Sequence, residues 1–327
     1  MRGVNAWVGL AAGWLGAGGL GAAELTVNED FSGDPAGRGW RIFGEAALFH
    51  WDAGGGRLAV TWDSSQSNSY FYLPLGRTLR KADEFELSFT VRLSAVQLGS
   101  TPGKPYTFEI AVGLLNLTAA TRPDFLRGTG FNSPNLLEWD YFPDSGFGAT
   151  VAATLISEQH QWATSFNSPL PLETDVEYRF RLVFTPEDRR LRATMEAGNS
   201  LTPLQDVQLK DGFDDFSLDT LAVMSYSDAG QDPQFAGSIR AEGVVDDLWL
   251  EVRPPAIQEF HGALEQGAWR ATFIGRADFD YTLEASDDLR AWTAVAGPIP
   301  GTGTVQSLTD PRPMAARAFY RLRAARR

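Results

Sequence analysis

Apolar residues occupy alternate positions in several runs of the chain, among them 85–93, 108–114, 178–184 and 191–195. Alternation with a period of two predicts strands that bury one face in a core. Turn-forming sequences separate the runs, and the one at Thr185–Asp188 joins two of them as a hairpin. No segment has the pattern of a long amphipathic helix. The chain is therefore expected to be all-β, with a two-sheet antiparallel jelly-roll sandwich as its main domain.

A domain boundary is expected at Pro254 and Pro255, because two prolines cannot continue the apolar run 244–252 as a central strand. This boundary divides a jelly-roll domain, 24–253, from a small C-terminal β-sandwich module, 254–327. Strands of the module are predicted at 268–274, 281–285, 292–295 and 319–323.

The N-terminus has the layout of a secretory signal peptide. A basic Met1-Arg2 start is followed by an apolar, glycine-rich stretch at 6–20 and by small residues that end at Ala23. The apolar stretch is short for a transmembrane helix. We therefore predict a signal peptide, 1–23, that is cleaved after Ala23. The mature protein would be secreted, periplasmic or on the bacterial cell surface, with no membrane insertion after cleavage.

Composition excludes several classes of partner and site. The 327 residues carry a formal net charge of −13, so the surface repels phosphate backbones and nucleic acid is not an expected partner. The chain contains 0 cysteines, which rules out disulfides, thiolate metal sites and cysteine nucleophiles.

Candidate chemistry is concentrated in the segment NLLEWDYFPDSG, 135–146. Leu137, Trp139 and Tyr141 share one face of the predicted strand and are assigned to the core. Glu138 and Asp140 then project together onto the opposite surface, which we expect to be the concave face of the jelly roll. Two ionised carboxylates at this spacing repel unless a cation or a shared proton lies between them. They are interpreted as catalytic groups, metal ligands or residues of a solvated sheet face.

The first domain, from NEDFSGDPAGRGW (28–40) to VVDDLWLEV (244–252), resembles the concanavalin A-like lectin and glucanase superfamily, which includes L-type lectins and LamG-like domains. The second resembles the small C-terminal β-modules of secreted bacterial proteins, which end in a stretch like FYRL (319–322). The resemblance implies a jelly roll that binds or cleaves carbohydrate.

Retaining glucanases of this superfamily use a strand motif E-x-D-x-E or E-x-D-x-x-E. The resemblance would make Glu138 the nucleophile and Asp140 its helper, but Phe142 and Pro143 occupy the two acid/base positions. Neither residue can transfer a proton, so a hydrolase or lyase would use Glu138 and Asp140 in another arrangement.

The lectin motif E-x-D-x-[YF]-x-N matches the same strand better. Its metal ligands correspond to Glu138, Asp140, the carbonyl of Phe142 and Asp144. Oxygen ligands suit Ca²⁺. The next acidic and histidine ligands of the motif fall on Ala149 and Thr154, so the resemblance implies a single Ca²⁺ site.

Sugar-binding side chains are expected near this motif. Trp162 lies in a polar setting where an indole either stacks on a sugar or caps the edge of the sandwich, and Asn132 and Asn135 offer amides. Further candidates are Phe166, Asn167 and Tyr141, although the last is assigned to the core. We expect a secreted carbohydrate-binding, lectin-like protein that recognises an extracellular polysaccharide or glycan. The alternatives are a polysaccharide hydrolase or lyase and a structural surface or matrix protein.

Overall fold

The computed structural model describes residues 4–8, 25–127, 132–234, 236–312 and 318–327. The chain divides into two compact units, Leu25–Val252 and a smaller one that contains Arg253–Arg327. Helices in the described residues are limited to η1 (Pro35–Arg38), η2 (Ala46–Leu48) and α1 (Leu117–Ala120). The predicted all-β fold is confirmed.

One sheet of the larger unit has seven strands, all antiparallel to their neighbours. In spatial order they are β11 (Trp162–Asn167), β10 (Thr150–Ile156), β9 (Leu136–Phe142), β8 (Ile110–Leu115), β15 (Leu218–Ser225), β6 (Ser69–Leu79) and β3 (Arg41–Phe43). The candidate segment therefore lies inside this sheet, in β9.

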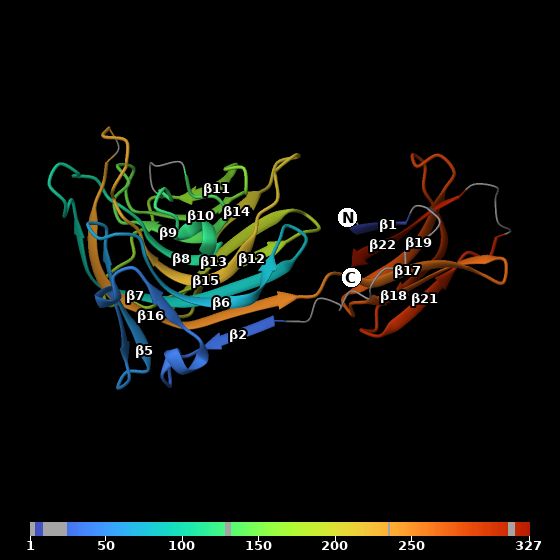
Figure 1. Ribbon diagram of the computed structural model, residues 1–327, viewed down its shortest axis with the longest axis horizontal. Helices are drawn as coiled ribbons and strands as arrows, with labels where there is room; N and C mark the ends of the chain where they lie inside the picture. Colours follow the sequence, from blue (N-terminus) through green and yellow to red (C-terminus); the bar gives the residue numbers. More distant parts are fainter. Residues whose placement is uncertain (1–3, 9–24, 128–131, 235, 313–317) are drawn as a thin grey trace. The chain divides into compact units, whose positions relative to one another are not determined.

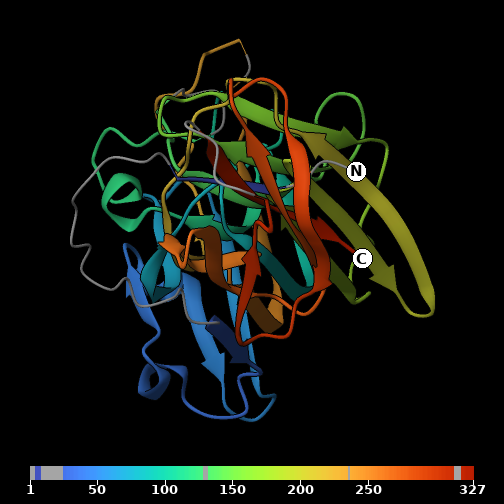
Figure 2. The same ribbon diagram turned by 90° about the vertical axis from the view of Figure 1, so that its right-hand side faces the viewer.

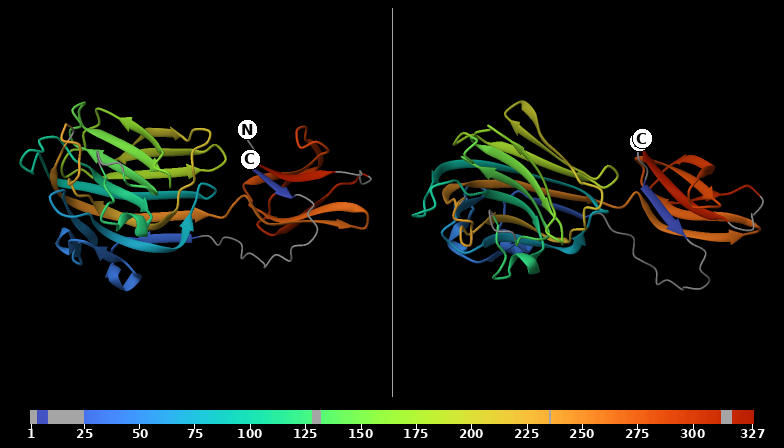
Figure 3. Two further views of the ribbon diagram at one scale, coloured as in Figure 1. Left: turned by 45° about the horizontal axis from the view of Figure 1, so that its top comes forward. Right: turned by 90° about the horizontal axis from the view of Figure 1, so that it is seen from above.

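The second sheet has eight strands. The order is β14 (Ser200–Gln208), β13 (Arg190–Ala197), β12 (Tyr178–Thr185), β7 (Glu84–Leu98), β16 (Ile239–Arg253), β5 (Arg57–Asp63) and β4 (Phe49–Asp52), and β2 (Leu25–Glu29) also pairs with β16. Figure 1 labels strands of both sheets in the larger unit, and Figure 3 shows the curvature of the long strands. The blue β4 and β5 lie at one edge of this unit (Figure 2).

The core of the larger unit fills the space between the two sheets. Trp139 of β9 packs against Phe180 of β12 at 4.4 Å between ring centroids and against Phe89 of β7 at 5.6 Å. These contacts join one sheet to the other, as in a sandwich. The apolar positions of the predicted alternating runs are buried, because the strand pleat directs every second side chain into this layer.

The smaller unit contains two sheets. The four-stranded sheet has the order β1 (Val4–Val8), β22 (Phe319–Arg326), β19 (Phe279–Ser286) and β20 (Thr293–Pro300). The three-stranded sheet has the order β17 (Ile257–Glu265), β18 (Ala268–Gly275) and β21 (Val305–Thr309). Trp269 and Tyr320 stack across them at 4.1 Å in a separate core.

The predicted signal peptide lies mostly outside the described residues, as does its cleavage site after Ala23. The part that is described, β1, pairs antiparallel with β22. No helix within the described residues is long and apolar enough to cross a membrane.

Candidate functional site

Strand β9 lies between β10 and β8, and both of its faces are covered. Leu137, Trp139 and Tyr141 point into the core, as predicted. Glu138 and Asp140 lie on the other face, but the prediction that they project onto an open surface of the sheet is wrong. Both side chains are 0% exposed. A side chain from an irregular segment that precedes β9 covers them, and a strand pattern carries no information about such a cover.

The covering group is the side chain of Arg127, which follows α1 in the chain and is itself buried. Its Nε donates a hydrogen bond to Glu138 Oε1, and its Nη2 lies 3.3 Å from Asp140 Oδ1. The same Nη2 lies 3.4 Å from Glu109 Oε2. Glu109, Arg127, Glu138 and Asp140 together form what we call the buried charge cluster.

Two neutral side chains complete the hydrogen bonds of the acids. The Tyr226 hydroxyl donates to Glu138 Oε2 at 2.8 Å, and the Thr154 hydroxyl donates to Asp140 Oδ2 at 2.7 Å. Glu138 and Asp140 are therefore each held by a cation and a hydroxyl. Buried carboxylates need such partners because an unpaired buried charge is strongly destabilising.

The cluster contains three carboxylates and one guanidinium, so two negative charges remain when all groups are ionised. Burial raises the pKa of Glu138 well above its usual range; Arg127 opposes this shift, and Asp140 and Glu109 add to it. Burial lowers the pKa of Arg127, but its three acidic neighbours outweigh this effect and keep the guanidinium charged. The excess charge must be neutralised by a proton or by a second cation.

Glu109, Glu138 and Asp140 could hold such a cation, since one oxygen from each lies within 4.8 Å of the others. The structure thus brings together two residues of the predicted metal set and adds Glu109. Phe142 ends β9, and Asp144 is exposed in the following turn, where it accepts a hydrogen bond from the amide of Gly146 at 3.0 Å.

A pocket of about 550 Å³ opens above this cluster. Arg127, Asp140 and Thr154 form its floor, and aromatic side chains form its walls. Four of the aromatic residues are exposed to solvent: Tyr106 (56%), Phe147 (87%), Trp162 (37%) and Phe166 (63%). We call this the aromatic pocket. Exposed apolar side chains that gather around a concavity mark a binding surface.

The aromatic pocket continues into a second space of about 420 Å³. The two spaces share Phe142, Ser145, Phe147 and Phe166. Ser168 and Thr150 add hydroxyl-bearing side chains to the second space. The combined groove is large enough for more than one ring of a ligand.

Of the predicted sugar-binding residues Trp162, Asn132 and Asn135, Trp162 lines the aromatic pocket and the two asparagines do not. Trp162 begins β11 and lines the aromatic pocket, where its ring stacks on Arg127 with the guanidinium carbon 5.1 Å from the ring centroid. Asn132 donates to the carbonyl of Asp124 at 2.7 Å, and Asn135 accepts from the amide of Ser217 at 2.8 Å. Both amides hold the loops around the site together, and neither is among the described residues that line the pocket.

Sequence reasoning did not select Glu109, Arg127, Tyr106 or Phe147. Glu109 carries a usable signal, because it is an acid at the start of the apolar run 108–114. Arg127 and Tyr106 lie outside the named strands, and only the folded chain shows that Arg127 contacts β9 and that Tyr106 lines the pocket.

No family model matches the chain, and no curated protein matches its sequence. Solved structures similar to it include a Lotus tetragonolobus seed lectin, with 12% identity, a TM-score of 0.46, and coverage of 71% of this chain and 99% of the lectin. Peanut lectin has 12% identity, a TM-score of 0.41, and coverage of 69% and 99%. An alginate lyase has 10% identity, a TM-score of 0.41, and coverage of 69% and 96%.

Proposed function

We propose that the larger unit binds carbohydrate without cleaving it, in the aromatic pocket on the seven-stranded sheet. The observation that carries this proposal is the set of four exposed aromatic rings around one concavity. Sugar rings present flat C–H faces that pack on aromatic rings, while their hydroxyls need hydrogen-bonding partners. A pocket with aromatic walls and a few polar groups meets both requirements.

The polar groups of the pocket support the same ligand class. Gln234 is exposed at its rim, so its amide can reach a hydroxyl. Gln231 instead forms two hydrogen bonds with the backbone of Gly237, which fixes the loop that bears both glutamines. Ser145 and Thr154 contribute hydroxyl groups to the lining. The charged side chains that form the floor, Arg127 and Asp140, are buried.

The hydrolase alternative is less well supported by this geometry. A glycosidase places two carboxyl groups on either side of the scissile bond. Glu138 is fully buried, and its two oxygens accept hydrogen bonds from Arg127 and Tyr226. An acid in this position cannot contact a substrate. We therefore assign Glu138 and Asp140 to shaping the floor of the pocket.

We further propose that Ca²⁺ neutralises the cluster, held by Glu109, Glu138 and Asp140. Three carboxylates are hard oxygen ligands, and the two excess negative charges match a divalent ion. A bound ion would stabilise the floor of the pocket. Thermal melting in EDTA and in millimolar Ca²⁺ tests this role: calcium should raise the melting temperature of the wild type and not that of Asp140→Asn. If the wild type melts at the same temperature in both buffers, Ca²⁺ does not bind the cluster, and protons neutralise it instead.

The setting that we propose is extracellular. A chain with a cleaved signal peptide would meet a polysaccharide outside the cell, and the smaller unit would serve as an attachment or spacer module. Detection of the mature N-terminus after Ala23 in a secreted fraction tests the cleavage.

A glycan array with the purified protein, together with turnover assays on a polysaccharide panel, tests the function. Binding to a defined glycan without product formation is the expected result. Product formation would support the hydrolase or lyase alternative, and the absence of both would support the structural protein.

A further inference from the structure

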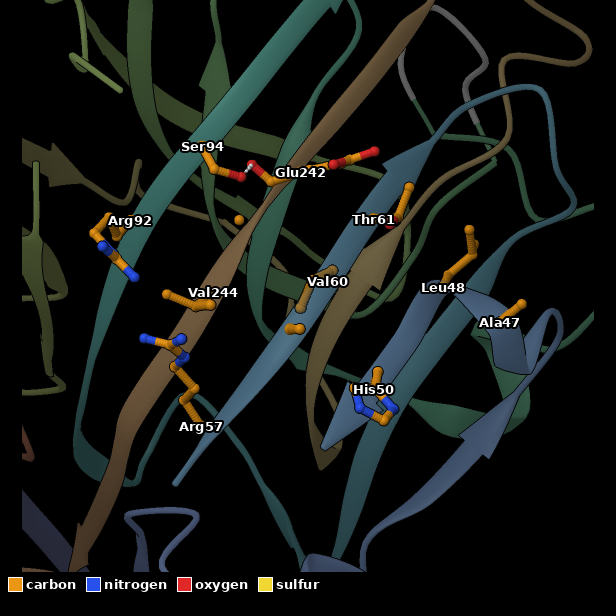
Figure 4. A pocket seen from close by; sticks show the side chains of 12 residues that line it. Ala47, Leu48, His50, Arg57, Val60, Thr61, Arg92, Ser94, Glu242 and Val244 are labelled. Carbon is orange, nitrogen blue, oxygen red and sulfur yellow. Dashed lines mark hydrogen bonds between the residues drawn. The ribbon is translucent and has the colours of Figure 1, made fainter. Parts of the chain in front are cut away.

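A second pocket, of about 330 Å³, lies on the outer face of the eight-stranded sheet. It is formed by β7, β16, β5 and β4 together with η2, and its lining includes His50, Arg57, Arg92 and Val244. Figure 4 shows Arg57 and Arg92 on either side of Val244. We call it the arginine pocket. It lies on the other sheet from the aromatic pocket.

Strand register brings these side chains to one face. Val244 of β16 is directly opposite Ala59 of β5, which in turn is opposite His50 of β4. Arg57 is two residues from Ala59 and thus shares its face. On β7, Leu93 points into the core, so the adjacent Arg92 points outward. The cationic groups converge because β7 and β5 flank β16.

The side chain of Arg92 has no hydrogen bond or ion pair with any residue in the described part of the chain. Arg57 binds Asp52 only through Nε, at 3.1 Å. Asp52 also accepts hydrogen bonds from the amides of Gly54 and Gly55, and the bond from Gly55 contributes most to a lowered pKa of its carboxyl. The terminal nitrogens of both guanidinium groups are therefore available to a ligand.

Asp52 pairs with Arg57, but no acid in the described residues pairs with Arg92, so one positive charge remains in the pocket. Glu242 lines it, but its Oε1 lies 3.8 Å from Nη2 of Arg240. Two guanidinium groups with a small apolar floor between them form an unusual feature on a protein with a net charge of −13. Guanidinium groups bind carboxylates and sulfates through paired, charge-assisted hydrogen bonds.

We propose that the arginine pocket binds the anionic group of an acidic saccharide, with Arg57 and Arg92 on the carboxylate or sulfate and the sugar ring over Ala59 and Val244. The volume matches the lower end of small-ligand sites, which is the size of a single sugar unit. His50 adds a polar ring at the side of the pocket.

Calorimetric titration of the full-length protein with three trisaccharides tests this site: one carboxylated, one sulfated and one neutral. At least one acidic trisaccharide should bind the wild type, and Arg92→Gln should weaken that binding at least ten-fold. Arg57→Gln is a second variant with the same expected loss. Which acidic trisaccharide binds distinguishes carboxylate from sulfate recognition.

Arg179→Gln is the matched control, since Arg179 is an exposed cation on β12 of the same sheet and does not line the pocket. Its affinity should equal that of the wild type. Three results would overturn the site. They are unchanged binding in both pocket variants, an equal loss of affinity in the control, and no binding of either acidic trisaccharide. Phe166→Ala, in the aromatic pocket, should leave this binding intact, so failure of one site is separable from failure of the other.

Discussion

At the scale of single residues, the guanidinium of Arg127 accounts for how two acids can lie side by side inside a sheet. It contacts Glu138, Asp140 and Glu109 at once, and Trp162 covers it. The sequence predicted that Glu138 and Asp140 share a face and need a positive partner. It could not identify Arg127, because contacts between an irregular segment and a strand leave no periodic signal.

Replacement of Arg127 by methionine should be strongly destabilising. The variant leaves three buried carboxylates without their cation, and removal of one partner from a buried ion pair costs about 3–5 kcal/mol in the free energy of unfolding. Chemical denaturation of both proteins in EDTA provides the measurement. The added substitution Glu138→Gln should restore part of the loss, because one less charge is buried. A stable single variant would contradict the assigned role.

A second residue-scale prediction concerns Asp246 on β16. Partial burial raises the pKa of its carboxyl to about 6, against a backbone hydrogen bond from Asp247, and nearby negative charges add to the rise. The folded protein therefore holds this proton more tightly than the unfolded chain, and stability falls as pH increases from about 4 through 6. Asp246→Asn removes this loss.

Melting temperatures of Asp246→Asn and the wild type should be similar at pH 4, and the variant should melt higher at pH 8. The amide oxygen of asparagine can still accept the hydrogen bond from Asp247, so the comparison isolates the charge. An unchanged difference between the two proteins across this pH range would contradict the raised pKa.

At the scale of elements, the alternating patterns predicted the strands correctly but did not show what covers the second face of each strand. Alternation in 85–93 and 178–184 predicted two strands with one buried face, because burial against the opposite sheet selects every second side chain. The structure shows that these strands, β7 and β12, pair with each other. In β9 the same rule assigned Trp139 correctly and left Glu138 on an open face of the sheet. The face of β9 that bears Glu138 is covered by Arg127 and Trp162. The alternation within a strand carries no information about such residues.

The pairing of β8 with β9 depends on Gly113. It is opposite Glu138, and a Cβ at this position would lie 2.1 Å from the carbonyl oxygen of Leu137. Gly113→Ala should therefore force the two strands apart and lower the free energy of unfolding by roughly 1–3 kcal/mol or more. Gly37→Ala is the control, because no atom lies within 4 Å of a Cβ there. Equal stability of the two variants would contradict the close approach of Gly113 to the backbone of β9.

At the scale of the whole molecule, the residues that the structure describes form two separate hydrophobic cores. Every residue of one core lies between Phe31 and Val252, and every residue of the other between Ala256 and Ala324. Pro254 and Pro255 stand between them, where the sequence predicted a boundary. This boundary could be predicted from the sequence because it depends on two adjacent residues alone: prolines interrupt a central strand whatever the rest of the fold is.

The fragment 25–252 should consequently fold alone. Its calorimetric transition should coincide with one of two transitions of the full-length chain, because each unit buries its own apolar surface. A fragment that lacks a cooperative transition would show that the cores depend on each other.

The central claim is that the aromatic pocket binds carbohydrate, and the most direct test is calorimetry with a glycan selected on the array, using Phe166→Ala and Ile42→Ala. Phe166 is 63% exposed in the pocket, whereas Ile42 is 40% exposed on β3, at the other edge of the same sheet. Phe166→Ala should weaken binding at least ten-fold, or about 1.4 kcal/mol, with unchanged melting. Ile42→Ala should bind like the wild type. Equal affinity of all three proteins would contradict the account.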